Sequence, residues 1–140
     1  MCIRDRLQTL DDALRAWRRY QQISYDKFAQ DTDTQYMVRH AMLLSIQASI
    51  DLATGMAVII TPRRPATYRE TFQALGKFQV IPEDLAGDLS TLAGFRNILV
   101  HEYTRLDEKR VYKILQEHWQ TLDAFRMHAK EFIKKNKMAE

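Results

Sequence analysis

The stretch YMVRHAMLLSIQASIDLATGMAVII, residues 36–60, is the part of the chain that decides the fold class. It runs without a proline, and its single glycine is Gly55. We therefore expect one long helix over 36–60. The TPRRP segment that follows, residues 61–65, must end this helix, because each proline lacks an amide donor and disfavours helical geometry in the residue before it.

The residues before this stretch predict a shorter helix. Apolar side chains repeat three and four positions apart at Leu7, Leu10, Leu14 and Trp17, which is the spacing of one amphipathic helix face. The polar segment 24–33 then offers several helix-cap candidates.

Three further helices are predicted after residue 65. Thr67 and Glu70 have the spacing of a capping box at the start of a short helix. Pro82 suits the first position of a fourth helix, which we expect to continue to about Glu102. Asp107 is the expected cap of a fifth helix, whose apolar stripe runs through Val111, Ile114, His118, Leu122, Phe125, Ala129 and Phe132.

The composition agrees with a helical fold. The 140 residues are 46% hydrophobic, enough for a single domain over residues 1–140. Four glycines and three prolines leave little room for the tight turns of sheets and barrels. We therefore predict an all-α fold: an antiparallel bundle of four main helices plus one short helix.

Cysteine content and the N-terminus indicate a cytoplasmic protein. The single cysteine, Cys2, permits no internal disulfide, and we assign it no role. No apolar leader precedes the first helix, and no run is expected to reach the length of a membrane span. Residues 1–6, MCIRDR, are interpreted as a possible non-native leader.

The charge is compatible with RNA without indicating it strongly. Lysine and arginine exceed aspartate and glutamate by a formal +3, and the pI is near 9.1. This balance favours an anionic partner, but it lacks the concentrated basic stripe of a dedicated nucleic-acid-binding protein.

The stretch LAGFRNILVHEY, residues 92–103, carries the candidate chemistry. The apolar line of the fourth helix continues from Leu92 to Arg96, and then to Leu99 and Tyr103. Burial of an unpaired charge costs several kcal/mol. Arg96 is therefore expected either to have a good partner or to face a cleft that holds an anion.

Arg96, Asn97 and His101 together suit metal-independent RNA cleavage. Asn97 and His101 are four residues apart and share a helix face. Histidine exchanges protons near neutral pH, and a fixed arginine stabilises charge that develops on a phosphate. Because residues five apart on a helix are separated by about 140°, Arg96 and His101 of one chain do not easily aim at one phosphate. A second copy across a two-fold axis is expected to complete the cleft.

The segment RNILVHEY, residues 96–103, resembles the signature of HEPN-domain toxins of the HepT-like family. The similarity covers roughly residues 10–125 and includes SIQASIDLA in the second helix, RRPATYRETF and VIPEDLA. The resemblance implies a small helical endoribonuclease toxin that dimerises, with a minimal nucleotidyltransferase as its antitoxin. It implies that Arg96 and His101 are catalytic, that Asn97 supports them, and that the antitoxin adenylylates Tyr103.

Other polar residues are weaker candidates. Asp51 is interpreted either as a cleft residue that pairs with Arg96 or as a solvent-facing carboxylate. His40, His118 and His128 lack metal-ligand spacing and are expected to be structural or exposed, so we predict no metal and no cofactor.

Two other functions remain open from the sequence. The chain is alternatively a non-catalytic helical module that binds a nucleotide or a nucleotidyltransferase partner. It is also compatible with a plain helical-bundle dimer, although that reading leaves Arg96 in the apolar line unexplained. The spacing of Arg96 and His101 favours the enzyme, because a scaffold has no need of a proton-transfer group there.

Overall fold

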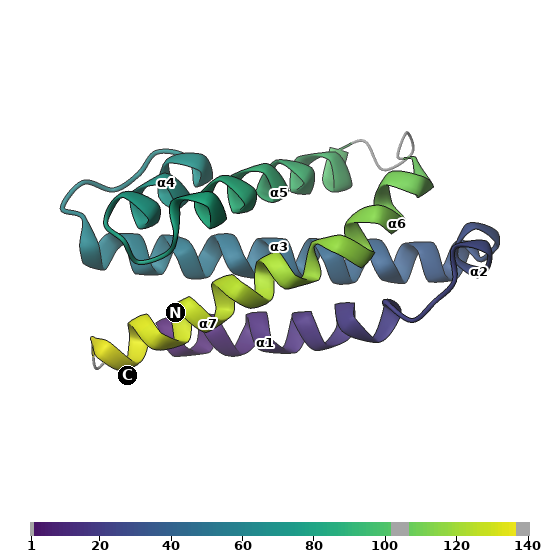
Figure 1. Cartoon of the computed structure of the whole chain (residues 1–140), viewed down its shortest axis with the longest axis horizontal. Helices are drawn as coiled ribbons and strands as arrows, with labels where there is room; N and C mark the ends of the chain where they lie inside the picture. Colours follow the sequence, from purple (N-terminus) through teal and green to yellow (C-terminus); the bar gives the residue numbers. More distant parts are fainter. Residues whose placement is uncertain (1, 102–106, 137–140) are drawn as a thin grey trace.

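The computed structural model describes residues 2–101 and 107–136, and within these ranges it contains helices and no strand. The all-α prediction is confirmed. Seven helices are described, against the five expected (Figure 1): α1 (Ile3–Tyr20), α2 (Tyr25–Gln30), α3 (Thr32–Ile60), α4 (Tyr68–Lys77), α5 (Glu83–His101), α6 (Glu108–Glu117) and α7 (Trp119–Lys135).

The long helix α3 is the centre of the molecule. It contacts each of the other six helices. In Figure 1, α1 and α7 lie on one side of α3, whereas α4 and α5 lie on the other. The chain runs in opposite directions along α1 and α3, and again along α5 and α7.

Helix α3 is long and apolar enough, by length and composition, to cross a membrane. The expectation that no run reaches this length was therefore wrong. Much of its apolar surface is used inside the bundle instead, where the fully buried side chains of α3 include Val38, Met42, Ile46, Leu52 and Met56.

Side-chain caps mark where α2, α3, α4 and α6 begin. The Thr67 hydroxyl accepts a hydrogen bond from the Glu70 amide at 3.1 Å, as the capping-box spacing predicts. Asp107 caps α6 by accepting from the Lys109 amide at 2.9 Å. Asp31 caps α3 through the Thr34 amide, so this helix begins four residues before the predicted Tyr36.

The sequence did not predict α2. Ser24 caps it by accepting from the Lys27 amide at 3.2 Å, and Phe28 is its fully buried side chain. A six-residue helix contains too few turns to show a periodic apolar pattern, and its stability depends on packing.

The single fifth helix that was predicted is broken at His118 into α6 and α7. In an unbroken helix the Leu115 carbonyl would accept from the amide of residue 119. Here it accepts from two side chains at the end of α1, Trp17 Nε1 at 2.9 Å and Gln21 Nε2 at 3.1 Å. Trp119 Nε1 in turn donates to the Leu14 carbonyl at 2.9 Å, which ties both sides of the break to α1.

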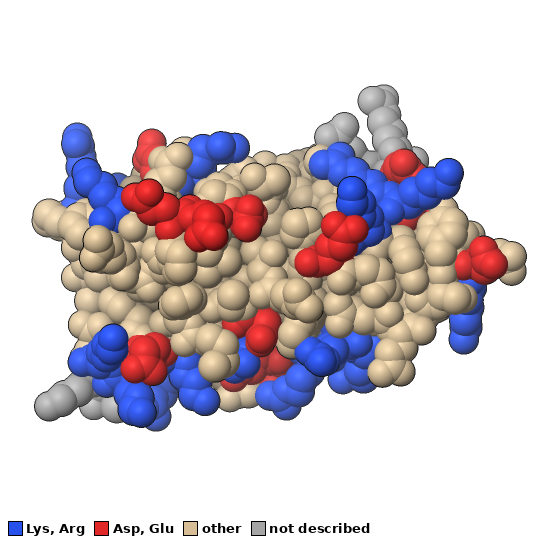
Figure 2. Space-filling model, viewed as in Figure 1, with Lys and Arg blue, Asp and Glu red and all other residues tan. Residues whose placement is uncertain are grey.

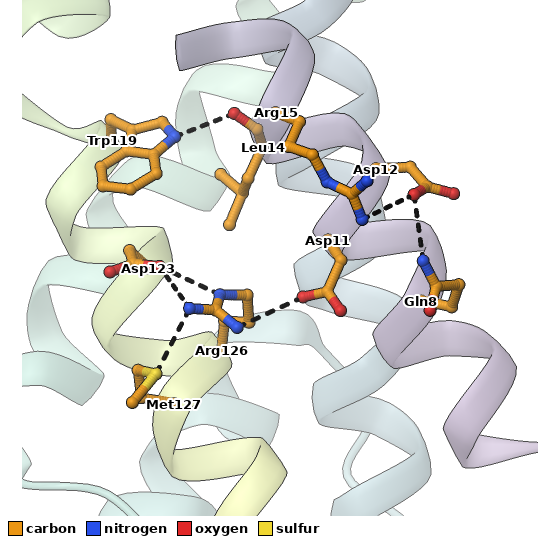
Figure 3. Close-up of polar contacts among 9 residues, drawn as sticks. All are labelled: Gln8, Asp11, Asp12, Leu14, Arg15, Trp119, Asp123, Arg126 and Met127. Atoms are coloured by element: carbon orange, nitrogen blue, oxygen red, sulfur yellow. Dashed lines mark hydrogen bonds and ion pairs between the residues drawn. The ribbon is translucent and has the colours of Figure 1, made fainter.

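Helix α1 packs against α7 through polar as well as apolar contacts. Arg126 of α7 lies between Asp123, to which its Nε donates at 3.0 Å, and Asp11 of α1, at 3.5 Å (Figure 3). Helix α1 begins at Ile3, which is buried, and therefore includes most of the segment that was interpreted as a leader.

Candidate active site

Helix α5 presents one arginine in a line of buried leucines. Leu89, Leu92 and Leu99 are buried, and Arg96 occupies the position that continues their line. Its side chain is half-buried. Arg96 therefore lies on the core-facing line of α5, as its helical spacing predicts.

The guanidinium of Arg96 is held on two sides. Its Nε donates a hydrogen bond to Gln47 Oε1 of α3, and its Nη1 donates to Asn97 Oδ1 at 3.0 Å. Among the described residues, no carboxylate forms an ion pair with Arg96. A half-buried cation whose partners are both neutral favours an anionic ligand.

Asp51 takes part in this site without touching Arg96. The Gln47 amide bridges the two, since its Nε2 donates to Asp51 Oδ1 at 2.9 Å while its Oε1 accepts from Arg96. The direct ion pair between Asp51 and Arg96 that the sequence suggested is absent from the described residues. The exposed Asp51 side chain is instead linked to Arg96 through one amide.

The backbone of Asp51 is attached to the first helix. Arg6 Nη1 donates to the Asp51 carbonyl at 2.8 Å. Gly55 makes room for this arginine, because a Cβ at Gly55 would lie 2.8 Å from Arg6 Nη1. Helices α1, α3 and α5 are thus joined by one row of contacts that ends at Arg96.

His101 is the last residue of α5 and is exposed. It lies one turn beyond Asn97, on the exposed part of the helix, whereas Arg96 turns towards α3. Tyr103, the expected modification site, lies outside the described residues.

A half-buried ion pair joins α3 to the start of α6. Arg39 Nη2 contacts Glu108 Oε1, and their side chains are only 12% and 27% exposed. Burial raises the pKa of Glu108, with Arg39 opposing the shift and Asp107 adding to it. This pair anchors the chain soon after the signature segment.

Positive charge near the end of α5 comes also from α6. The guanidinium of Arg110 lies over the Phe95 ring, 5.3 Å from its centroid. Phe95 directly precedes Arg96 in the sequence. On the face in Figure 2, lysine and arginine are interspersed with acidic side chains around a largely uncharged middle. No continuous basic stripe crosses this face, as the modest net charge indicated.

The remaining histidines lie apart from this cluster. His40 is exposed, His118 lies at the α6–α7 break beside Thr121, and His128 lines a hollow between α7 and the α4–α5 connection. Four hollows on the described surface are lined by other residues than Arg96, Asn97 and His101. No group of three potential metal-ligating side chains occurs within the described ranges.

The sequence interpretation missed Gln47. One signal was available, because glutamine and aspartate four residues apart on a helix form a recognised hydrogen-bonded pair. That spacing does not show that the same amide also accepts from Arg96, which is 49 residues away in the chain.

Comparison with known families and proteins agrees with the signature. Residues 10–129 match the model of the family described as "Ribonuclease HepT-like". A tRNA nuclease HepT from Aphanizomenon flos-aquae is 29% identical over 110 residues, 79% of this chain and 75% of the relative. An mRNA nuclease HepT from Shewanella oneidensis is 29% identical over 113 residues, 79% of this chain and 85% of the relative.

Solved structures share the fold. A tri-AMPylated HEPN toxin of Shewanella oneidensis, in complex with MNT antitoxin, superimposes with a TM-score of 0.82 at 25% identity, covering 92% of this chain and 96% of that one. The cytosolic protein YutE of Bacillus subtilis, of unknown function, has a TM-score of 0.81 at 20% identity, covering 96% and 90% of the two chains.

Proposed function

This chain belongs to the HepT-like ribonuclease family, and we propose that it cleaves RNA at the face of α5 that carries Arg96 and His101. The observation that carries the assignment is the half-buried Arg96, held by Gln47 and Asn97 with no carboxylate partner among the described residues. Such a fixed cation suits an RNA phosphate. His101 stands exposed within two turns of it.

The proposed reaction uses the ribose 2′-hydroxyl as the nucleophile. Its oxygen forms a bond to the adjacent phosphorus while the bond from phosphorus to the 5′ oxygen breaks. One proton leaves the 2′-hydroxyl and one reaches the 5′ oxygen, so the products are a 2′,3′-cyclic phosphate and a 5′-hydroxyl. Arg96 stabilises the charge on the phosphoryl oxygens, His101 transfers a proton, and Asn97 steadies Arg96.

A homodimer completes the proposed site. Arg96 turns towards α3 whereas His101 lies on the open end of α5, so a second copy supplies the opposing groups around one phosphate. Exposed apolar side chains lie on the two helices that frame the site, with Leu44 of α3 at 48% and Val100 of α5 at 39% exposure. An apolar surface of this kind beside a polar site is typical of a protein interface.

The proposed partner is a nucleotidyltransferase antitoxin. A structurally similar toxin is AMPylated and bound to MNT antitoxin. For this chain, we place the modification on Tyr103, two residues after His101. Added phosphate near Arg96 and His101 excludes RNA by bulk and by charge. A reducing cytoplasm, where RNA is available, suits a toxin whose only cysteine is Cys2.

The test is cleavage of a labelled RNA by the purified protein and by His101→Ala. Loss of the proton-transfer group lowers the cleavage rate by at least about a hundredfold, while circular dichroism stays unchanged because the side chain is exposed. Cleavage by the parent protein persists in EDTA and leaves a 2′,3′-cyclic phosphate. Equal cleavage by both proteins, or a chelator-sensitive activity, contradicts this assignment.

Binding of RNA or nucleotide by the parent protein, with no cleavage under any of these conditions, instead supports the non-catalytic binding module.

A further inference from the structure

Gln47 lies beside Arg96 and hydrogen-bonds to both Arg96 and Asp51. Its half-buried side chain projects from the middle of α3 and reaches the Nε edge of Arg96 on α5. A guanidinium has five donors in a fixed plane, so a partner on Nε determines which way its Nη groups point. Here Nη1 points to Asn97, and no other hydrogen bond from this guanidinium reaches a described residue.

The amide of Gln47 has only one orientation that satisfies both neighbours. Its oxygen must face Arg96, because Arg96 Nε is a donor, and its nitrogen must then face the Asp51 carboxylate, which accepts. Both hydrogen bonds have a charged partner and are stronger than neutral ones. Asp51 therefore prevents the amide from turning its nitrogen towards the guanidinium.

We propose that Gln47, held by Asp51, is a positioning residue that orients Arg96 for the RNA phosphate. This proposal rests on the proposed function. A neutral acceptor does this while leaving the positive charge of Arg96 available, which a carboxylate at the same place would neutralise. The arrangement therefore explains why Arg96 is bonded through an amide when Asp51 lies one turn further along α3.

Gln47→Met tests the proposal, because methionine has a similar length and no hydrogen-bonding amide. A guanidinium released on its Nε side no longer presents its Nη groups in one place. We expect kcat for a model RNA to fall by about tenfold to a hundredfold, with KM within about threefold. The pH profile keeps its shape, because His101 is unchanged.

Helix α1 offers a matched control. Gln8 Nε2 donates to Asp12 Oδ1 at 3.0 Å, which is the same pair at the same spacing, and Figure 3 shows it on α1, away from the contact of Asp11 with Arg126 of α7. Gln8→Met loses a similar bond and leaves both kcat and KM unchanged. A Gln47→Met enzyme with the kcat of Gln8→Met overturns the proposal.

A second pair of variants tests the part played by Asp51. Asp51→Ala lowers kcat by severalfold because the amide of Gln47 is free to turn. Asp51→Asn recovers most of that loss, because its amide oxygen accepts the same bond. Equal kcat values for the two variants contradict the role of Asp51.

A readout that needs no RNA separates this proposal from the proposed function. In ¹⁵N-correlated NMR spectra, the Arg96 Nε–H signal, assigned by its loss in Arg96→Lys, exchanges slowly with water in the parent protein and in Gln8→Met. It exchanges faster in Gln47→Met. Absence of RNA cleavage by the parent protein refutes the proposed function, whereas equal exchange in Gln47→Met and the parent protein refutes the positioning role.

Discussion

A single side chain in an unfavourable place is the strongest indication of function in this protein. Arg96 occupies a position in a line of buried leucines on α5, where an apolar side chain would be expected. Natural sequences accept such a local loss mainly at functional sites. Two neutral amides hold Arg96, from Gln47 and Asn97, so the charge is ordered and remains available to an anion.

At the same scale, Tyr103→Phe tests the modification site. The change removes the proposed acceptor oxygen and keeps the ring, so we expect the variant to fold and to remain toxic. Incubation of the parent protein with the proposed nucleotidyltransferase partner, ATP and magnesium is expected to add one or more AMP units, each about 329 Da with about one negative charge. We expect intact mass spectrometry to show no such increment on Tyr103→Phe, and we expect that the partner no longer silences that variant by catalysis.

Tyr36→Phe is the control for this experiment, since Tyr36 is 55% exposed on α3 and lacks the signature around it. It accepts AMP and is neutralised like the parent protein. An unchanged mass increment on Tyr103→Phe excludes Tyr103 as the acceptor.

At the scale of the element, capping residues determine where α2, α3, α4 and α6 begin. Asp31 accepts from the amide and from the hydroxyl of Thr34, and these two bonds lower the pKa of its carboxyl. The lowered pKa means that the ionised cap stabilises the folded protein above the pH at which an unfolded aspartate titrates, about 3.9. This stabilisation is lost as the pH falls through the folded pKa.

We therefore expect Asp31→Ala to lower the urea midpoint of unfolding at pH 7. Asp31→Asn keeps a cap acceptor and loses less. Because asparagine does not titrate, the advantage of the parent protein over Asp31→Asn shrinks as the pH is lowered below about 4. Urea titrations at pH 7 and pH 3 measure both effects, and a difference that grows on acidification contradicts the role of the ionised cap.

At the scale of the whole molecule, one copy leaves the site open. Four hollows on the described surface lie away from Arg96 and His101, and the surface of α3 and α5 beside these two residues carries exposed apolar side chains. The proposed second copy on this surface would bury the apolar groups and enclose the proposed phosphate-binding groups in one step.

Light scattering tests the dimer directly. The parent protein is expected at about twice its chain mass of 16.5 kDa at micromolar concentration. Leu44→Glu places a charge in the proposed interface, which costs several kcal/mol to desolvate, and yields a monomer with little cleavage activity. Phe78→Glu, at an equally exposed site at the end of α4, remains dimeric and active. A monomeric parent protein, or a dimeric Leu44→Glu, contradicts this interface.

The sequence by itself determined the local features of this protein. These features depend on residues that are a few positions apart. They are the end of α3 at 61–65, the caps at Thr67 and Asp107, and the core-facing line that includes Arg96. Such features follow from helix geometry and capping, which act over one or two turns. The signature segment is likewise a run of eight consecutive residues, 96–103, so its resemblance to the HepT-like family was visible without a structure.

The tertiary structure alone decided what depends on residues far apart in the chain. The break at His118 exists because Trp17 and Gln21, 98 and 94 residues from Leu115, occupy the Leu115 carbonyl. Gln47 acquires its role because packing of α3 against α5 brings it to Arg96, and Asp51 is linked to Arg96 only through it. A hydrogen bond between two helices depends on their packing geometry, which the periodicity of either sequence does not contain.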